Sequence, residues 1–142
     1  MQELNISYLQ EVWPQLELYI HGGVNFKTYQ NAFHTCTNKA INYMETYNAS
    51  EGFFGIQNNL SESDLLLLLD HGVFYEFIPI VDNKEDEQNI IPLQDVKKHT
   101  IYSMVITTNG GLWRYKIGDT IYFTSTHPYK IKIYGRTKHY IN

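Results

Sequence analysis

Short apolar runs separated by turn residues fill the second half of this chain, and they constrain its fold more than any other feature. The clearest example comprises Ile101 to Thr107, the turn Asn109-Gly110-Gly111, and Leu112 to Ile117. Two β-prone runs joined by a glycine-containing turn are typical of a β-hairpin. The composition agrees, because aromatic residues make up 15% of the chain and aromatic side chains suit half-buried pleated surfaces.

The same pattern continues on both sides of this hairpin. Asp64 to Leu69 and Val73 to Ile80 predict another hairpin with a short turn, and Thr120 to Thr124 and Lys130 to Tyr134 predict further strands. Residues 82–89 are polar and charged without a hydrophobic period, so we expect a loop that projects into solvent.

The first part of the chain has a different pattern. Residues 2–12 predict a short helix that Pro14 ends. Leu16 to Ile20 and Ile41 to Thr46 predict two strands, and a helical stripe of apolar residues over 25–35 predicts a helix between them. The order strand, helix, strand indicates one crossover unit, in which a parallel pairing would be right-handed.

We therefore expect an α/β fold in two parts. Residues 1–60 would form a mixed α/β unit, and residues 61–142 would form a β-rich, hairpin- or barrel-like half. A chain of 142 residues is long enough to bury a core.

Composition excludes several classes of protein. The net charge of -4 and the lack of a basic stripe argue against nucleic-acid binding. The longest apolar run, Leu65 to Leu69, is too short to span a bilayer, so we expect no membrane partner. Cys36 is the single cysteine, and the first residues do not have the pattern of a signal peptide. We therefore expect a cytoplasmic protein. His34 and Cys36 lack two further ligands at zinc spacing.

The first stretch that could carry chemistry runs from Tyr115 to Asp119. An aspartate follows a glycine at the end of an aromatic, β-prone run. A carboxylate held at a strand end can accept two hydrogen bonds from vicinal hydroxyls, such as those of a ribose. A β-turn with a solvated aspartate is the alternative, and this stretch alone favours it.

The second stretch, Tyr47 to Gly52, directly follows the second predicted strand. Ligands of α/β units favour the carboxyl ends of strands. Tyr47 could stack on a base, Ser50 could bond a phosphate oxygen, and Glu51 could hold a Mg²⁺. The alternative is a polar loop in which Ser50 caps a turn.

The third stretch, Gly22-Gly23-Val24, ends the first predicted strand. Glycines at this place allow a ligand to approach the backbone closely. A tight strand-to-helix turn is the alternative explanation.

The combination of these stretches with Gly135-Arg136-Thr137-Lys138 resembles the adenylate-forming ligases. It is most similar to the Gretchen Hagen family of acyl-acid amido synthetases, auxin-responsive plant proteins with bacterial relatives. Those proteins carry Tyr-Ala-Ser-Ser-Glu where this chain has Tyr47 to Glu51, and Tyr-Arg-Val-Gly-Asp where it has Tyr115 to Asp119. The segment Glu76-Phe77-Ile78-Pro79 is also similar to that family.

The resemblance implies an enzyme that uses ATP and Mg²⁺ to adenylate a carboxylic acid and then transfers the acyl group to an amine, such as an amino acid. It implies cofactor-binding roles for seven residues, a Mg²⁺ role for one and a hinge role for one. By this resemblance, the adenine would contact Tyr47, Gly22, Gly23 and Val24, and the ribose would contact Asp119 and Arg136. Ser50 would contact the α-phosphate, and Glu51 would bind Mg²⁺. Lys138 would be the hinge.

The chain also departs from the family pattern. The Ser/Thr/Gly-rich phosphate loop and the C-terminal domain of such ligases have no counterpart in this sequence. We therefore expect a middle fragment of the N-terminal domain that ends at the hinge, has the remainder of the parent enzyme as its partner, lacks a complete catalytic set and is inactive alone. The alternative hypothesis is a non-catalytic β-rich binding module, in which Tyr47, Glu51 and Asp119 would have no reason to converge on one cleft.

Overall fold

β-strands provide most of the regular structure in the computed structural model, which describes residues 6–23 and 26–137. Its strands are β1 (Leu18–Gly22), β2 (Asn42–Ala49), β3 (Gly52–Ile56), β4 (Leu65–Leu67), β5 (Val73–Val81), β6 (Lys84–Glu85), β7 (Ile91–Pro92), β8 (Ile101–Thr108), β9 (Tyr115–Thr126) and β10 (Tyr129–Arg136). Its helices are η2 (Leu9–Glu11), α1 (Lys27–Thr35) and η3 (Leu93–Asp95), of which η2 and η3 are 3-10 helices.

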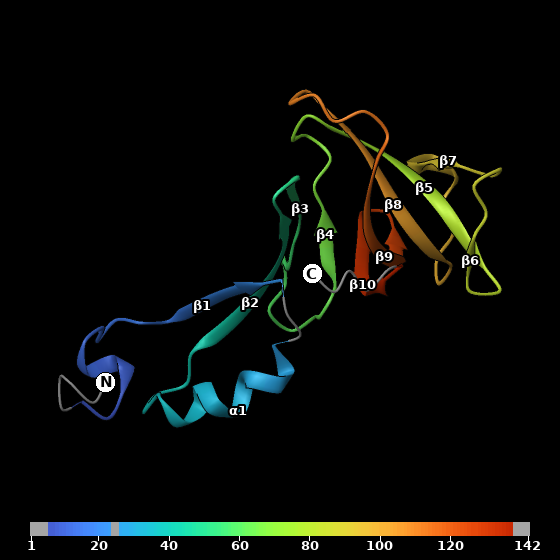
Figure 1. Ribbon diagram of the computed structural model, residues 1–142. Coiled ribbons are helices and arrows are strands. Elements are labelled where there is room, and N and C mark those ends of the chain that lie inside the picture. Colours follow the sequence, from blue (N-terminus) through green and yellow to red (C-terminus); the bar gives the residue numbers. More distant parts are fainter. Residues whose placement is uncertain (1–5, 24–25, 138–142) are drawn as a thin grey trace.

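The predicted strand–helix–strand unit is present near the start of the chain. β1 and β2 pair in parallel, with Leu18 opposite Asn42, and α1 connects them (Figure 1). Aromatic side chains join the helix to the strands, because the ring of Tyr19 lies 4.6 Å from that of Phe33 and the ring of Phe26 lies 4.9 Å from that of Tyr43. This packing follows from the apolar stripe of the helix.

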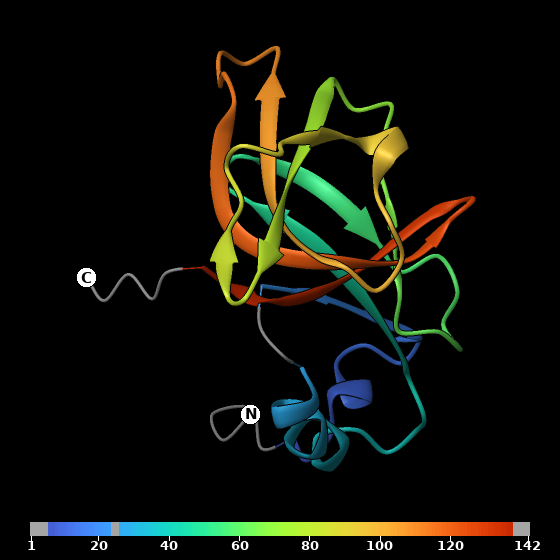
Figure 2. The ribbon, with the colours of Figure 1, turned by 90° about the vertical axis from the view of Figure 1, so that its right-hand side faces the viewer.

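The remaining strands continue the same sheet. The strand order is β1-β2-β3-β4-β10-β9-β8-β5-β6, and β7 pairs with β5. Apart from the β1–β2 pair, these ladders are antiparallel. The sheet curls strongly, so that the green and orange strands surround a common interior in Figure 2. The connection from β3 to β4 lies near residue 60, where we expected a boundary between two parts. β3 and β4 are hydrogen-bonded neighbours in the sheet.

The α/β class that we expected is not confirmed, because the described residues are mostly β-sheet and α1 is their single α-helix. The expected helix over 2–12 reduces, within the described part, to the three residues of η2. The expected hairpin of β4 with β5 is wrong: β4 pairs with β3 and β10, whereas β5 pairs with β8, β6 and β7. Leu65 and Leu67 are both buried, and pairing on both sides gives that short strand its place in the interior.

The core lies inside the curled sheet. Alternate residues of β5, β8 and β9 point into it, as the period of two in a strand requires. Its fully buried members include Phe77, Tyr102, Met104, Ile106, Ile121 and Phe123. The hairpin of β8 and β9 that the sequence predicted is confirmed, with Ile106 opposite Tyr115.

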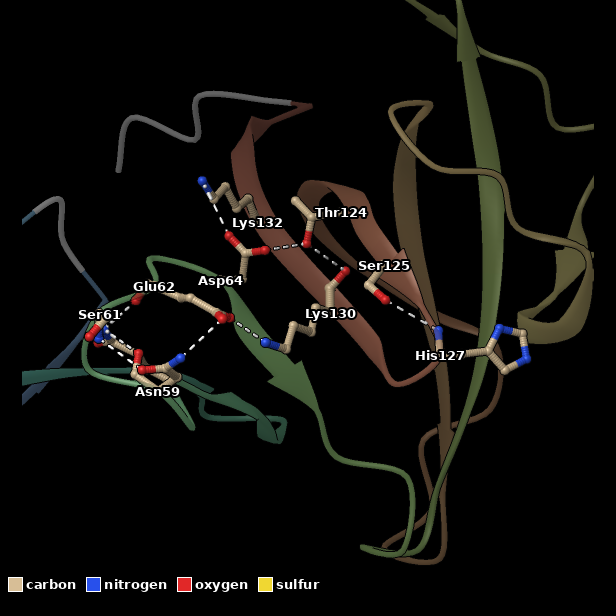
Figure 3. Close-up of polar contacts among 10 residues, drawn as sticks. Asn59, Ser61, Glu62, Asp64, Thr124, Ser125, His127, Lys130 and Lys132 are labelled. Atoms are coloured by element: carbon tan, nitrogen blue, oxygen red, sulfur yellow. Dashed lines mark hydrogen bonds and ion pairs between the residues drawn. The ribbon is translucent and has the colours of Figure 1, made fainter.

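A polar network holds the connection between β3 and β4 against β9 and β10, two central strands of the sheet (Figure 3). The Lys130 ammonium group of β10 pairs with Glu62. Asp64 accepts a hydrogen bond of 2.6 Å from the Thr124 hydroxyl of β9 and lies 3.3 Å from the Lys132 ammonium group. These contacts attach Glu62 and Asp64, at the end of segment 57–64, to β9 and β10.

The charged segment 82–89 does not simply project into solvent as expected. It contains β6, and the Lys116 ammonium group of β9 pairs with both Glu85 and Glu87. Among the residues that the structure describes, no helix has the length and apolar character needed to cross a bilayer.

Candidate functional site

A bulge in β9 places Asp119. We expected this aspartate at the end of a strand, but it lies inside a strand of 12 residues. Ser103 pairs with Thr120 and Val105 pairs with Lys116, so three residues of β9 face one residue of β8. Gly118 within this bulge has a φ of 88°, a backbone conformation that glycine adopts without strain. The bulge turns the Asp119 side chain towards the interior, where the residue is 6% exposed.

Arg136 is the first partner of Asp119. The two residues are directly opposite in the ladder of β9 and β10, and the Arg136 Nε donates a hydrogen bond of 2.7 Å to Asp119 Oδ1. The hydrogen bond and the negative charge raise the pKa of Arg136 above its usual value. The arginine side chain is 64% exposed and the aspartate side chain 9%, so solvent reaches the pair from the arginine side.

Tyr47 is the second partner, and it comes from β2, far from Asp119 in the sequence. Its hydroxyl donates a hydrogen bond of 2.8 Å to Asp119 Oδ2 across a separation of 72 residues. Burial raises the pKa of Tyr47 strongly, and the Asp119 charge adds to the rise, so the hydroxyl stays a neutral donor. The ring is 4% exposed and packs edge-on against Phe54.

Tyr47 lies within β2 rather than in a loop after it, because β2 is longer than predicted. The strand continues to Ala49, and a tight turn at Ser50 and Glu51 leads directly into β3. The two strands form a hairpin in which Tyr47 faces Gly55.

Glu51 lies at that turn, and together with Ser50 and Tyr115 it extends the contacts of Tyr47, Asp119 and Arg136 into what we call the cluster. Its carboxylate accepts hydrogen bonds from the Ser50 hydroxyl at 2.9 Å and from the Tyr115 hydroxyl at 3.2 Å. Partial burial alone would raise the pKa of Glu51, but these hydrogen bonds and the nearby Arg136 charge outweigh it, and the net pKa is lowered. The carboxylate is therefore ionised at neutral pH. The Tyr115–Glu51 contact could not be predicted from the sequence, because the two residues are 64 positions apart.

The glycines of the third stretch lie beside this cluster. Gly22 ends β1 and pairs with Thr46, the neighbour of Tyr47. A Cβ atom on Gly22 would lie 2.7 Å from the Thr46 carbonyl oxygen and from Asn48 Oδ1, so the close backbone approach in this structure is to β2. Gly23 follows with a φ of 77°, as a tight turn requires. Two predicted site residues, Val24 and Lys138, lie outside the described residues.

A cleft adjoins the cluster on the side of Arg136. Its volume is about 630 Å³, which lies within the range of roughly 300–1,000 Å³ that ligand pockets span. Tyr115, Gly118 and Arg136 line it, whereas Tyr47, Glu51 and Asp119 are not among its lining residues. The arginine thus connects the buried pair to an accessible hollow.

The donor sets fit parts of a nucleotide to different degrees. Each Asp119 oxygen has one bonded partner, and a carboxylate oxygen can accept two hydrogen bonds, so one acceptor site on each oxygen has no protein donor among the described residues. No group of three or more His, Cys, Asp or Glu that could hold a metal occurs in the described part of the chain. Glu51 is a lone carboxylate, which suits a Mg²⁺ whose other ligands are phosphate oxygens and water.

Comparison with known proteins adds an independent result. The GH3 family central domain matches residues 66–136, half of the chain. The chain is 30% identical over 139 residues to the probable indole-3-acetic acid-amido synthetase GH3.11 of Oryza sativa subsp. japonica, covering 84% of this chain and 21% of that protein. It is 27% identical over 143 residues to the indole-3-acetic acid-amido synthetase GH3.17 of Arabidopsis thaliana, covering 84% and 23%.

A solved structure shares the fold. The GH3.15 acyl acid amido synthetase in complex with 2,4-DB superposes with a TM-score of 0.70 at 21% identity, covering 90% of this chain and 22% of that one. The chain therefore spans about a fifth of the length of the relatives that it matches. The matched central domain includes Asp119 and Arg136. By these matches the chain belongs to the GH3 family of acyl acid amido synthetases.

Proposed function

We propose that this chain forms the nucleotide-binding part of an ATP-dependent acyl-acid amido synthetase. The complete reaction would join a carboxylic acid to AMP with release of pyrophosphate and then transfer the acyl group to an amine such as an amino acid. The remainder of the parent enzyme would be the partner of this chain in that reaction. A cytoplasmic location remains a prediction.

One observation carries this proposal. Tyr47 and Asp119, which the sequence singled out separately, share a hydrogen bond, and Arg136 completes the arrangement. Glu51 lies close enough for the Arg136 charge to lower its pKa. We expected Tyr47, Glu51 and Asp119 to converge on one cleft, and none of them is among the residues that line the cleft beside Arg136. The direct contacts of Asp119 with Tyr47 and Arg136 are what supports the synthetase over a non-catalytic binding module.

Each residue has a proposed task. Asp119 accepts hydrogen bonds from the ribose hydroxyls, and Arg136 lies beside the ribose on the solvent side. Ser50 contacts the α-phosphate, and Glu51 binds Mg²⁺. Gly22, Gly23 and Val24 line the adenine pocket, Tyr47 contacts the adenine through the 4% of its surface that is exposed, and Lys138 serves as the hinge.

Bound ATP would supply an activated phosphate and the pyrophosphate leaving group. The residues of this chain would contribute by orientation and by charge. Holding the ribose fixes the position of the phosphates relative to the acid, and correct positioning of reactants accounts for a large part of enzymatic rate enhancement. Glu51, held ionised by its hydrogen bonds, would keep a cation near the phosphates, where charge stabilisation has its effect.

We predict that Asp119→Ala weakens ATP binding about ten- to a hundredfold. Two hydrogen bonds to a charged acceptor contribute roughly 1.5–3 kcal/mol each, water offsets part of the loss, and about 1.4 kcal/mol corresponds to a factor of ten. The loss should occur with and without Mg²⁺. Isothermal calorimetry with ATP and AMP measures both conditions.

Two controls accompany this measurement. Glu51→Ala should weaken ATP binding only when Mg²⁺ is present, because the proposed contact of Glu51 is to the metal. Asp70→Ala removes an exposed carboxylate outside the cluster and should leave the affinity unchanged. Equal affinity of Asp119→Ala and the wild type would refute the ribose role.

A further inference from the structure

The Asp119 carboxylate is held by two donors that differ in rigidity. Arg136 approaches Oδ1 from a side chain that is 64% exposed, whereas Tyr47 approaches Oδ2 from a residue that is 4% exposed. Holding a long, exposed arginine side chain in one rotamer costs conformational entropy, so Arg136 keeps much of its rotamer freedom. Tyr47 is therefore the donor whose position the fold itself determines.

The surroundings of Tyr47 determine where its hydroxyl lies. The ring packs at 5.2 Å from the Phe54 ring, with an interplanar angle of 60°, and belongs to the main core cluster. An aromatic side chain has two rotatable bonds, so a packed ring holds its hydroxyl in one place. The hydroxyl is protonated throughout the accessible pH range because burial raises the pKa of Tyr47, and it can serve only as a donor to the carboxylate.

We infer that the Tyr47 hydroxyl is a positioning group that sets the direction of the Asp119 carboxylate for the two ribose hydroxyls of a nucleotide. This inference rests on the proposed function. Tyr47 then acts through Asp119, and its hydroxyl has a role separate from any contact between its ring and a base. Each carboxylate oxygen retains one acceptor site after binding its protein donor. If the carboxylate rotated, these two sites would point away from the ribose hydroxyls.

The chain offers a matched control for this hydroxyl. Tyr75 is also 4% exposed and belongs to the same core cluster. Its hydroxyl donates a hydrogen bond of 3.0 Å to the Leu68 carbonyl oxygen. Tyr75→Phe therefore removes a buried, bonded hydroxyl without removing a donor to Asp119, and it reports what the loss of such a group does to the fold alone.

The experiment compares ATP with 2′,3′-dideoxy-ATP, which lacks the ribose diol. Calorimetry gives both affinities for the wild-type chain, Tyr47→Phe, Tyr75→Phe and Asp119→Ala. We expect the wild type to prefer ATP, and Tyr47→Phe to weaken ATP binding about three- to tenfold. This is less than the loss of a direct hydrogen bond to a charged group would cause, because Tyr47 acts only through Asp119. Binding of the dideoxy nucleotide should stay within about twofold in that variant. Tyr75→Phe should leave the preference for ATP unchanged.

The double variant Tyr47→Phe/Asp119→Ala separates positioning from structural damage. If Tyr47 acts through Asp119, the double variant binds ATP with the same affinity as Asp119→Ala, because the Tyr47 hydroxyl has no carboxylate left to position. Additive losses overturn the inference, and so does an equal loss for ATP and the dideoxy nucleotide in Tyr47→Phe. A wild-type chain that binds ATP no better than its dideoxy form, or binds neither, overturns the proposed ribose site and with it this inference.

Discussion

At the scale of single residues, Gly118 decides whether Asp119 can reach the interior. Its φ of 88° belongs to the left-handed region, and a Cβ atom at this position would meet no atom within 4 Å. The cost of a side chain here is therefore one of backbone conformation and not of space. We predict that Gly118→Ala lowers the free energy of unfolding by about 1–2 kcal/mol, the usual cost of a left-handed residue with a side chain, as measured by urea denaturation.

Gly110→Ala provides the comparison for that variant. Gly110 does not have a positive φ, and a Cβ atom added to it would lie at an ordinary contact distance of 3.6 Å from Thr108 Oγ1. Its stability should change little or rise slightly, because alanine reduces the freedom of the unfolded chain. Equal stability of the two variants would show that the bulge in β9 does not depend on glycine.

At the scale of elements, the polar network of residues 57–64 makes stability depend on pH (Figure 3). The hydrogen bond and charge of Lys130 lower the pKa of Glu62. Burial alone would raise the pKa of Asp64, but the Thr124 and Lys132 contacts outweigh it and lower the pKa. Both folded-state pKa values lie below the ordinary values of 4.5 and 3.8. Their stabilisation is therefore present above those values and is lost as the pH falls through the folded-state pKa values.

We predict that the urea midpoint falls as the pH is lowered from about 5 to 3, and that Glu62→Gln/Asp64→Asn makes this dependence shallower. Neutral side chains cannot gain a proton, so the variant has less stability to lose. Asp70→Asn changes an exposed carboxylate outside the network and should retain the wild-type dependence. An unchanged slope in the double variant would contradict the role of the network.

At the scale of the whole molecule, stability is distributed unevenly along the sheet. β8 contains five consecutive buried residues, whereas β1 contains none and lies at the end of the strand order. Opening of a weakly buried edge costs less free energy than global unfolding. We predict that amide hydrogens of β1 exchange faster than those of β8, as measured by exchange detected with NMR. Equal protection of the two strands would indicate that α1 couples β1 fully to the core.

Local pattern was sufficient to predict several elements. The apolar stripe of α1 and the Asn109-Gly110-Gly111 turn between β8 and β9 both express preferences of neighbouring residues. The parallel crossover of β1, α1 and β2 follows the same logic of short-range connection. The stretches around Tyr47 and Asp119 could likewise be found from residue type and spacing, and their resemblance to a family could be stated from the sequence.

The ends and partners of strands required more than local pattern. β2 extends past Thr46 because β3 folds back on it, and β9 continues through Asp119 because β8 and β10 pair with it on both sides. A glycine in the sequence predicts the end of a strand. In β9 the pairing with neighbouring strands overrides that preference, because it supplies backbone hydrogen bonds on either side of the bulge.

The sequence by itself therefore determined which residues could serve a nucleotide, and the tertiary structure decided how they act on one another. Asp119 faces Arg136 because the β9–β10 register places them opposite each other. It meets Tyr47 because the sheet curls until residues 72 positions apart share a hydrogen bond. Neither contact follows from the order of residues, since register and curvature depend on bulges and on packing across the whole core.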